Sequence, residues 1–175
     1  TCIWLEQHKL EDGFLGDFEF ERRLWYTASY PIRTLLAGYH LLGHQSWLNI
    51  ALDILDIFVD EQMPDGAFTQ SYRHKRTIDM TEKELETVRQ TTWMNLADIG
   101  SMVVALTSSI PYVDDERKKR YTESVRKYID CWAMKYRQPN GGFTNGWVLK
   151  PADKVYSVST ATTALASAFF YQITN

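Results

Sequence analysis

Asp98 is the acidic residue of this sequence that is best placed for catalytic chemistry. It lies in an apolar stretch from Trp93 to Leu106, whose other polar groups are Asn95 and a few hydroxyls. Burial raises the pKa of a carboxyl group and suits a general acid, whereas a neighbouring Arg lowers it and suits a base or nucleophile. The alternative to a catalytic role is a structural one, in which the Asp98 carboxylate binds backbone groups or Arg33. The sequence favours this structural role, because single buried acids often are structural.

Several aromatic residues near predicted helix ends could stack on a sugar ring, because a sugar face offers C–H groups to an aromatic π cloud. The same rings could stabilise a carbocation. Packing in the core is the alternative for most of them. Trp147 is the strongest ligand candidate, because Gly and Asn residues surround it in a predicted loop. The full set is Trp25, Tyr26, Trp93, Trp147 and Tyr156.

Two arginines could bind an anionic group. Arg73 belongs to the basic run Tyr72-Arg73-His74-Lys75-Arg76, which could hold a carboxylate such as that of a uronate. Arg33 lies in a predicted apolar helix and could serve the same purpose. The alternative for the basic run is a solvated loop.

A second catalytic acid is missing from the apolar helices. Hydrolysis of a glycosidic bond usually needs two carboxylates, or one carboxylate and a positioned water. Asp12, Asp65 and Asp79 are loop candidates, but Asp12 and Asp65 are expected to shape turns. No pair of His residues has metal-ligand spacing, and no phosphate loop or nucleophile elbow is present. We therefore predict no metal site and no cofactor.

Composition excludes some classes of partner. The chain has 175 residues, with 19 Lys and Arg against 22 Asp and Glu, for a net charge of -3. There is no basic excess for a phosphate backbone, so nucleic acid is not expected as a partner.

No stretch has the length and apolarity of a membrane span, and no signal peptide opens the chain, so a cytoplasmic location is expected. Cys131 is expected to be a buried free thiol, among Ile129, Trp132 and Met134.

The elements that must position these residues repeat along the chain. Three segments share a Gly turn followed by Phe: Glu11-Asp12-Gly13-Phe14, Pro64-Asp65-Gly66-Ala67-Phe68 and Pro139-Asn140-Gly141-Gly142-Phe143. Asp or Asn before Gly favours a turn with positive φ. Each turn follows an apolar helical pattern. A fixed order of helix, Gly turn and helix indicates a helical repeat.

The helices alternate between two kinds. Those predicted over about 30–42, 93–106 and 156–172 are nearly uncharged and are expected to be buried on most sides, with Pro31 in the first turn of the first one. Those over about 46–62 and from 114 onward have one charged face. Residues 1–10 resemble the end of another helix of the second kind, and Thr81-Glu82-Lys83-Glu84 predicts a capping box that opens a short rim or lid helix to about Gln90.

Two concentric layers explain this alternation, with buried inner helices and half-exposed outer ones. The predicted fold class is all-α, with repeated inner and outer helix hairpins that form an arc of an (α/α) toroid. Residues 1–175 are interpreted as one partial domain, a fragment of a longer chain. Alternatively, a homo-oligomer could cover the open edges.

The run from Phe58 to Phe68, Phe-Val-Asp-Glu-Gln-Met-Pro-Asp-Gly-Ala-Phe, resembles the outer-helix end of (α/α) toroid proteins. The run from Tyr30 to Gly43 resembles their inner helix and turn. Two superfamilies share such repeats. One is the six-hairpin carbohydrate enzymes, which comprise glycoside hydrolases, unsaturated-uronyl hydrolases, polysaccharide lyases and sugar epimerases. The other is the terpenoid cyclases and prenyltransferases, whose Asp-rich and zinc-binding motifs are missing here.

The resemblance implies a carbohydrate-processing enzyme, or part of one, that acts on a glycan or uronic-acid sugar. Asp98 would be the acid or base. The orienting residues would be Trp93, Asn95, Trp147 and Tyr156, with Tyr26 as a further sugar contact and Arg33 or Arg73 as the anion ligand. The alternatives are a terpenoid cyclase-like protein and a non-catalytic helical repeat that binds a peptide or partner along its aromatic face.

Overall fold

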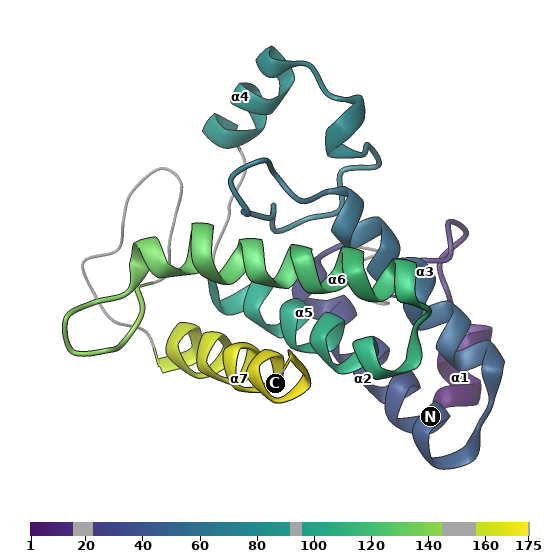
Figure 1. The fold of residues 1–175 in the computed structure, drawn as a ribbon. Helices are drawn as coiled ribbons and strands as arrows, with labels where there is room; N and C mark the ends of the chain where they lie inside the picture. The colour runs from purple at the N-terminus through teal and green to yellow at the C-terminus, as the bar shows by residue number, and fades with distance from the viewer. Residues whose placement is uncertain (16–22, 92–95, 145–156, 175) are drawn as a thin grey trace.

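The computed structural model describes residues 1–15, 23–91, 96–144 and 157–174, and these residues form an all-α fold. Seven α-helices appear in this part of the chain (Figure 1). They are α1 (Cys2–Gln7), α2 (Trp25–Leu42), α3 (Gln45–Asp60), α4 (Glu82–Thr91), α5 (Leu96–Ser109), α6 (Asp115–Lys127) and α7 (Ser157–Thr174). The only strand-like pairings described are two isolated bridges, Leu24 with Ser71 and Arg137 with Phe143.

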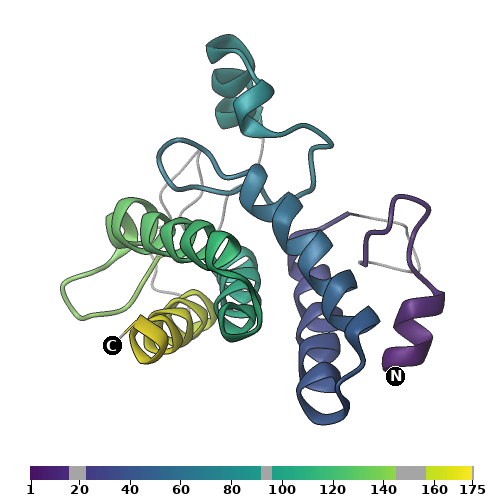
Figure 2. The same ribbon diagram turned by 45° about the vertical axis from the view of Figure 1, so that its right-hand side comes forward.

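The helices form the two predicted layers. Helices α2, α5 and α7 lie side by side as the inner layer, with α5 in contact with both others. Helices α1, α3 and α6 form the outer layer, and Figure 2 shows α6 over α5 and α3 over α2. Eleven of the fourteen residues of α5 are buried, which is consistent with its apolar composition, in which Asp98 is the one charged residue. The arrangement is therefore an arc of inner and outer helix pairs.

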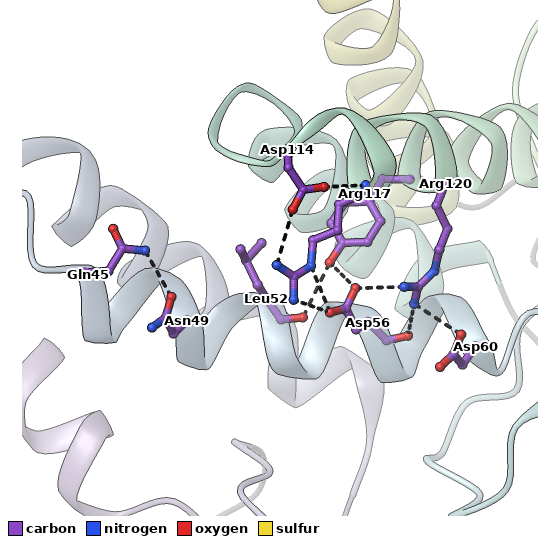
Figure 3. A network of polar contacts seen from close by, with 9 residues as sticks. Gln45, Asn49, Leu52, Asp56, Asp60, Asp114, Arg117 and Arg120 are labelled. Carbon is purple, nitrogen blue, oxygen red and sulfur yellow. Dashed lines mark hydrogen bonds and ion pairs between the residues drawn. The ribbon is translucent and has the colours of Figure 1, made fainter.

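A charged network joins two outer helices. Asp56 of α3 accepts hydrogen bonds from Arg117 Nε and Nη2, at 3.1 and 2.9 Å, and from the Tyr121 hydroxyl at 2.7 Å. Arg120 donates to the Asp56 carbonyl at 2.8 Å and contacts Asp60 at 3.2 Å (Figure 3). The acidic stripe of α3 predicted to face water therefore binds α6 in part, and this fixes the spacing of neighbouring helix pairs.

The three Gly turns have the same geometry. Gly13, Gly66 and Gly141 have φ values of 81°, 90° and 86°. In each turn the residue three before the Gly accepts a hydrogen bond from it, at 2.8, 2.9 and 2.9 Å. The side-chain oxygen of the Asp or Asn before each Gly also accepts a hydrogen bond from the backbone N–H two residues further along the chain. Polar groups are thus paired within each turn. The predicted repeat is thus a repeat of structure.

We expect Gly66→Ala to lower the free energy of unfolding by about 3 kcal/mol, because an added Cβ would combine positive φ with a steric clash. That atom would overlap the carbonyl oxygen of Lys127 at the end of α6. Gly13→Ala and Gly141→Ala are matched controls, because their φ values are similar but nothing lies within 4 Å of an added Cβ. Urea unfolding should give each control a loss of about 1 kcal/mol. Equal losses at all three positions would show that the close approach to α6 does not contribute.

Helix α4 belongs to a segment that projects from the layers (Figure 1). Its predicted capping box is confirmed: Thr81 N donates to Glu84 Oε2 at 2.8 Å, and Glu84 N donates to Thr81 Oγ1 at 3.3 Å. Arg89 ties the helix to the second Gly turn by an ion pair of 2.9 Å with Asp65. The segment is therefore anchored at its base by the same turn that separates two repeats.

Three local predictions are wrong. Helix α2 begins at Trp25, not Tyr30, because Trp25 and Ala28 are fully buried and their packing extends the helix ahead of Pro31. Cys131 is exposed, since residues Tyr128–Trp132 form a π-helical turn that buries Tyr128 and Trp132 instead. Helix α7 is not buried on most sides, because only Ser159, Thr163 and Ala166 of its eighteen residues are buried.

Candidate functional site

The N-terminal ends of α2 and α5 lie at the same end of the inner layer, and the predicted acid lies there. Asp98 is the third residue of α5 and is half-buried. Its Oδ2 accepts a hydrogen bond of 2.6 Å from Gln70 Nε2. A carboxylate fixed by a short hydrogen bond has a defined orientation, which a general acid or base needs.

Gln70 is held by a short backbone pairing with the entry to α2. Trp25 N donates to the Gln70 carbonyl at 3.0 Å, and Tyr72 N donates to the Arg23 carbonyl at 2.9 Å. These bonds flank the bridge between Leu24 and Ser71. The connection after the second Gly turn is therefore tied to the first inner helix, and it places the Gln70 amide against Asp98 of the second.

Two tyrosines form an aromatic pair beside this acid. Tyr26 and Tyr30 lie one turn apart on α2, with ring centroids 5.3 Å apart and planes at 88°. Their hydroxyls are hydrogen-bonded at 2.8 Å, and the residues are 37% and 51% exposed. The bond to Tyr30, partial burial and the charge of Asp98 raise the pKa of Tyr26. Tyr26 therefore stays protonated and can donate to a ligand while its ring stacks.

The two arginines predicted to bind an anion lie apart from each other. Arg33 is exposed further along α2, where it lines a hollow of about 250 Å³ with Leu36, Ala37, His40, Ser108 and Tyr112. In this hollow the Tyr112 hydroxyl and His40 Nδ1 are 2.8 Å apart. Arg73 is almost buried, and its guanidinium contacts Glu61, Thr77 and Met80. Arg73 thus anchors its own loop, whereas Arg33 faces an open space.

The burial of Glu61 makes stability depend on pH. Burial raises the pKa of Glu61 from 4.5 to about 7, against the opposing effects of the Arg73 backbone N–H and charge. The folded state then binds a proton more tightly than the unfolded state. The resulting stabilisation is complete below pH 4.5 and is lost as the pH rises through about 7.

We therefore expect the free energy of unfolding to fall by about 2–3 kcal/mol between pH 4.5 and pH 7.5 through Glu61. Urea unfolding of the wild type and of Glu61→Gln across this range measures that change. The slope should become smaller in Glu61→Gln, which cannot titrate at this position. A pH profile identical in the two proteins would contradict the assignment.

Four of the predicted sugar contacts, Trp93, Asn95, Trp147 and Tyr156, lie outside the described residues. The loop acids have structural partners: Asp12 contacts Arg23 at 2.6 Å, Asp65 contacts Arg89, and Asp79 contacts Arg76 at 2.8 Å.

Within the described ranges, no group of three His, Cys, Asp or Glu side chains could hold a metal ion. In the same ranges, no helix combines the length and apolarity needed to cross a bilayer.

Two residues of this site are absent from the sequence-based prediction. Gln70 follows a Gly turn and lies 28 positions before Asp98, so no spacing in the sequence connects them. Tyr30 could have been found from its place one turn after Tyr26, had the helix been extended to Trp25. We define the helix-end site as Tyr26, Tyr30, Gln70 and Asp98.

Comparison with known proteins supports the fold. No protein-family model and no curated protein sequence matches the chain. Among solved structures, the chain is similar to the crystal structure of a possible member of the GH105 family from Salmonella enterica, with a TM-score of 0.66. The match has 8% sequence identity and covers 99% of this chain and 48% of that one. The chain thus spans about half of that protein, and the likeness supports an (α/α) toroid fold of the glycosidase-like kind.

Proposed function

We propose that this chain is a carbohydrate-processing enzyme, or part of one, that acts on a glycan or uronic-acid sugar at the helix-end site. The observation that carries the proposal is the half-buried Asp98, oriented by Gln70 beside an exposed pair of tyrosines. An acid flanked by aromatic rings is the combination that sugar chemistry needs, since one group transfers a proton and the others hold the ring. The similarity to a possible GH105 member, a glycoside hydrolase family, points in the same direction.

The position of the site favours a substrate with an anionic group. The N-terminal ends of α2 and α5 carry the partial positive charge of the helix dipole, which attracts a carboxylate. In the proposed complex, Asp98 is the acid or base and Tyr26 contacts the sugar, with Trp93, Asn95, Trp147 and Tyr156 as further contacts. Of the two arginines, Arg33 is the better candidate for an anion ligand because it is exposed, further along α2 from the tyrosine pair, whereas Glu61 engages Arg73.

A non-catalytic binding module is the second candidate. It is supported by the loop acids Asp12, Asp65 and Asp79, which pair with arginines and so supply no evident second carboxylate. A terpenoid cyclase is less well supported, because such a reaction needs a closed apolar cavity and the tyrosine pair is open to solvent.

The test is a turnover assay of the purified chain on neutral and uronic-acid oligosaccharides, saturated and unsaturated, with product detection by mass spectrometry. The proposal predicts release or rearrangement of at least one sugar, with uronic-acid substrates preferred. Binding without turnover would support the binding module. Neither binding nor turnover on the whole panel would contradict the proposal.

A further inference from the structure

The hollow of about 250 Å³ that Arg33 lines lies between α2 and the C-terminal end of α5. One wall comes from α2. The other comes from Ser108, near the end of α5, and from Tyr112 in the 3₁₀ turn Ile110–Tyr112 that follows. Helices α2 and α5 pack against each other within this chain. The walls of the hollow are therefore fixed by contacts among described residues.

The hollow lies apart from the helix-end site. Ser108 follows Asp98 by ten residues on α5, or about 15 Å along a helix that rises about 1.5 Å per residue. His40 follows Tyr26 by fourteen residues on α2, or about 21 Å. The N-terminal ends of both helices form the helix-end site, so the hollow opens toward the other end of the inner layer.

The lining of the hollow is cationic. Arg33 is exposed, and none of the residues that the structure describes makes an ion pair or a hydrogen bond with its guanidinium. Among the described residues that line the hollow, none is acidic. A guanidinium without a carboxylate partner can bind an anionic ligand through paired N–H groups.

His40 can supply a second donor to the same anion. Its Nδ1 lies 2.8 Å from the Tyr112 hydroxyl. When that hydroxyl donates to Nδ1, the other ring nitrogen, Nε2, carries a proton and is a donor. The Tyr112 ring is held in place by Tyr39, with centroids 5.5 Å apart and planes at 86°. The pair of His40 and Tyr112 is therefore oriented before a ligand arrives.

Two oxygen atoms of the lining remain as acceptors. Ser108 Oγ donates its proton to the Val104 carbonyl at 2.8 Å, so this oxygen can only accept from a ligand. The Tyr112 oxygen is in the same position once it donates to His40. A carboxylate cannot donate to these oxygens, but a hydroxyl group can. The lining thus fits a ligand that carries both an anionic group and hydroxyl groups.

We infer that the hollow binds a small hydroxycarboxylic acid, with its carboxylate on Arg33 and His40 and its hydroxyl groups on Ser108 and Tyr112. One guanidinium offsets the single charge of a carboxylate, but only part of the charge of about −1.5 to −2 on a phosphate monoester. Pockets for drug-sized ligands have volumes of about 300–1,000 Å³, so a hollow of about 250 Å³ suits a smaller molecule, such as one open-chain sugar acid.

The experiment is an NMR titration of the isotope-labelled chain with D-gluconate. We expect backbone amide shifts at Arg33, His40, Ser108 and Tyr112 that saturate with a Kd in about the millimolar range. D-Sorbitol has the same carbon chain without the carboxylate, and acetate has the carboxylate without the hydroxyl groups. Each should bind at least about tenfold more weakly, because each lacks one of the two groups that the lining fits.

Variants assign the binding to the hollow. Arg33→Gln should weaken the affinity for gluconate about tenfold or more, because it removes the cation. Tyr112→Phe keeps the ring but removes the hydroxyl, and should weaken it by about twofold to tenfold, the effect of one neutral hydrogen bond. Arg126→Gln is the matched control, since it removes the same charge from an exposed position on the outer helix α6. Its affinity should equal that of the wild type.

Three results would overturn the inference: no saturable shifts up to about 50 mM gluconate, equal affinity in Arg33→Gln and the wild type, or tighter binding of D-sorbitol 6-phosphate than of gluconate. The inference does not rest on the proposed carbohydrate activity, because the hollow and the helix-end site are followed by different amides. Gluconate shifts confined to Tyr26, Tyr30, Gln70 and Asp98 would overturn this inference alone. Binding in the hollow without turnover of any glycan would contradict the proposed function alone.

Discussion

Asp98→Asn should reduce kcat on the responsive glycan by about 10²–10⁴-fold, the range that a positioned general acid or base contributes. The substitution keeps the size of the side chain and its place beside Gln70, but removes the proton-transfer group. Because the lost interaction belongs to the transition state, kcat and kcat/KM should fall together with little change in KM.

The control for this variant is Asp53→Asn, which removes the same charge from an exposed position on the outer helix α3. Its turnover should equal that of the wild type. Steady-state kinetics on one substrate, with circular dichroism to verify the fold, makes the comparison. Undiminished activity of Asp98→Asn would remove the catalytic role and leave this Asp as a structural partner of Gln70.

Arg73→Met should lower the free energy of unfolding by about 3–5 kcal/mol at pH 8, where Glu61 is ionised. The guanidinium lies almost buried against Glu61, with 3.6 Å between Arg73 Nε and Glu61 Oε2, and it also contacts Thr77 and Met80. Methionine fills a similar volume but leaves the buried carboxylate without its charged partner. The loss should be smaller at pH 5, where Glu61 is protonated.

Two comparisons make this prediction specific. Arg76→Met removes a neighbouring arginine whose partner, Asp79, is exposed, so the urea midpoint should not change measurably. The double variant Glu61→Gln with Arg73→Met should lose less free energy of unfolding than the sum of the two single variants. Each single variant leaves one buried charge without its partner, whereas the double variant removes both charges. Additive losses would show that the two side chains do not act as an ion pair.

The order and type of the helices were predictable from the sequence, because they follow from local patterns. Nearly uncharged helices alternate with helices that have one charged face, and three Gly turns, each with Asp or Asn before the Gly, recur between them. Positive φ at Gly and the periodicity of apolar residues depend only on neighbours in the chain. The comparison with a solved structure supports the two-layered arc that these patterns predicted.

Long-range contacts were not predictable in the same way. The bond from Gln70 to Asp98 and the network of Asp56 with α6 depend on how separate hairpins face one another. The start of α2 was missed because burial of Trp25 overrides the boundary that Pro31 suggests. The surroundings of Arg73 were missed because a basic run gives no sign that one of its members is buried against an acid from the preceding helix.

The most direct measurement of the central claim, that the helix-end site binds a sugar, is a titration of the isotope-labelled chain with a uronic-acid oligosaccharide, followed by NMR. We predict that backbone amide shifts saturate at Tyr26, Tyr30, Gln70 and Asp98, and that Tyr26→Ala weakens the fitted affinity about tenfold or more. Saturating shifts confined to other surfaces, or no shifts with any oligosaccharide of the panel, would contradict the claim.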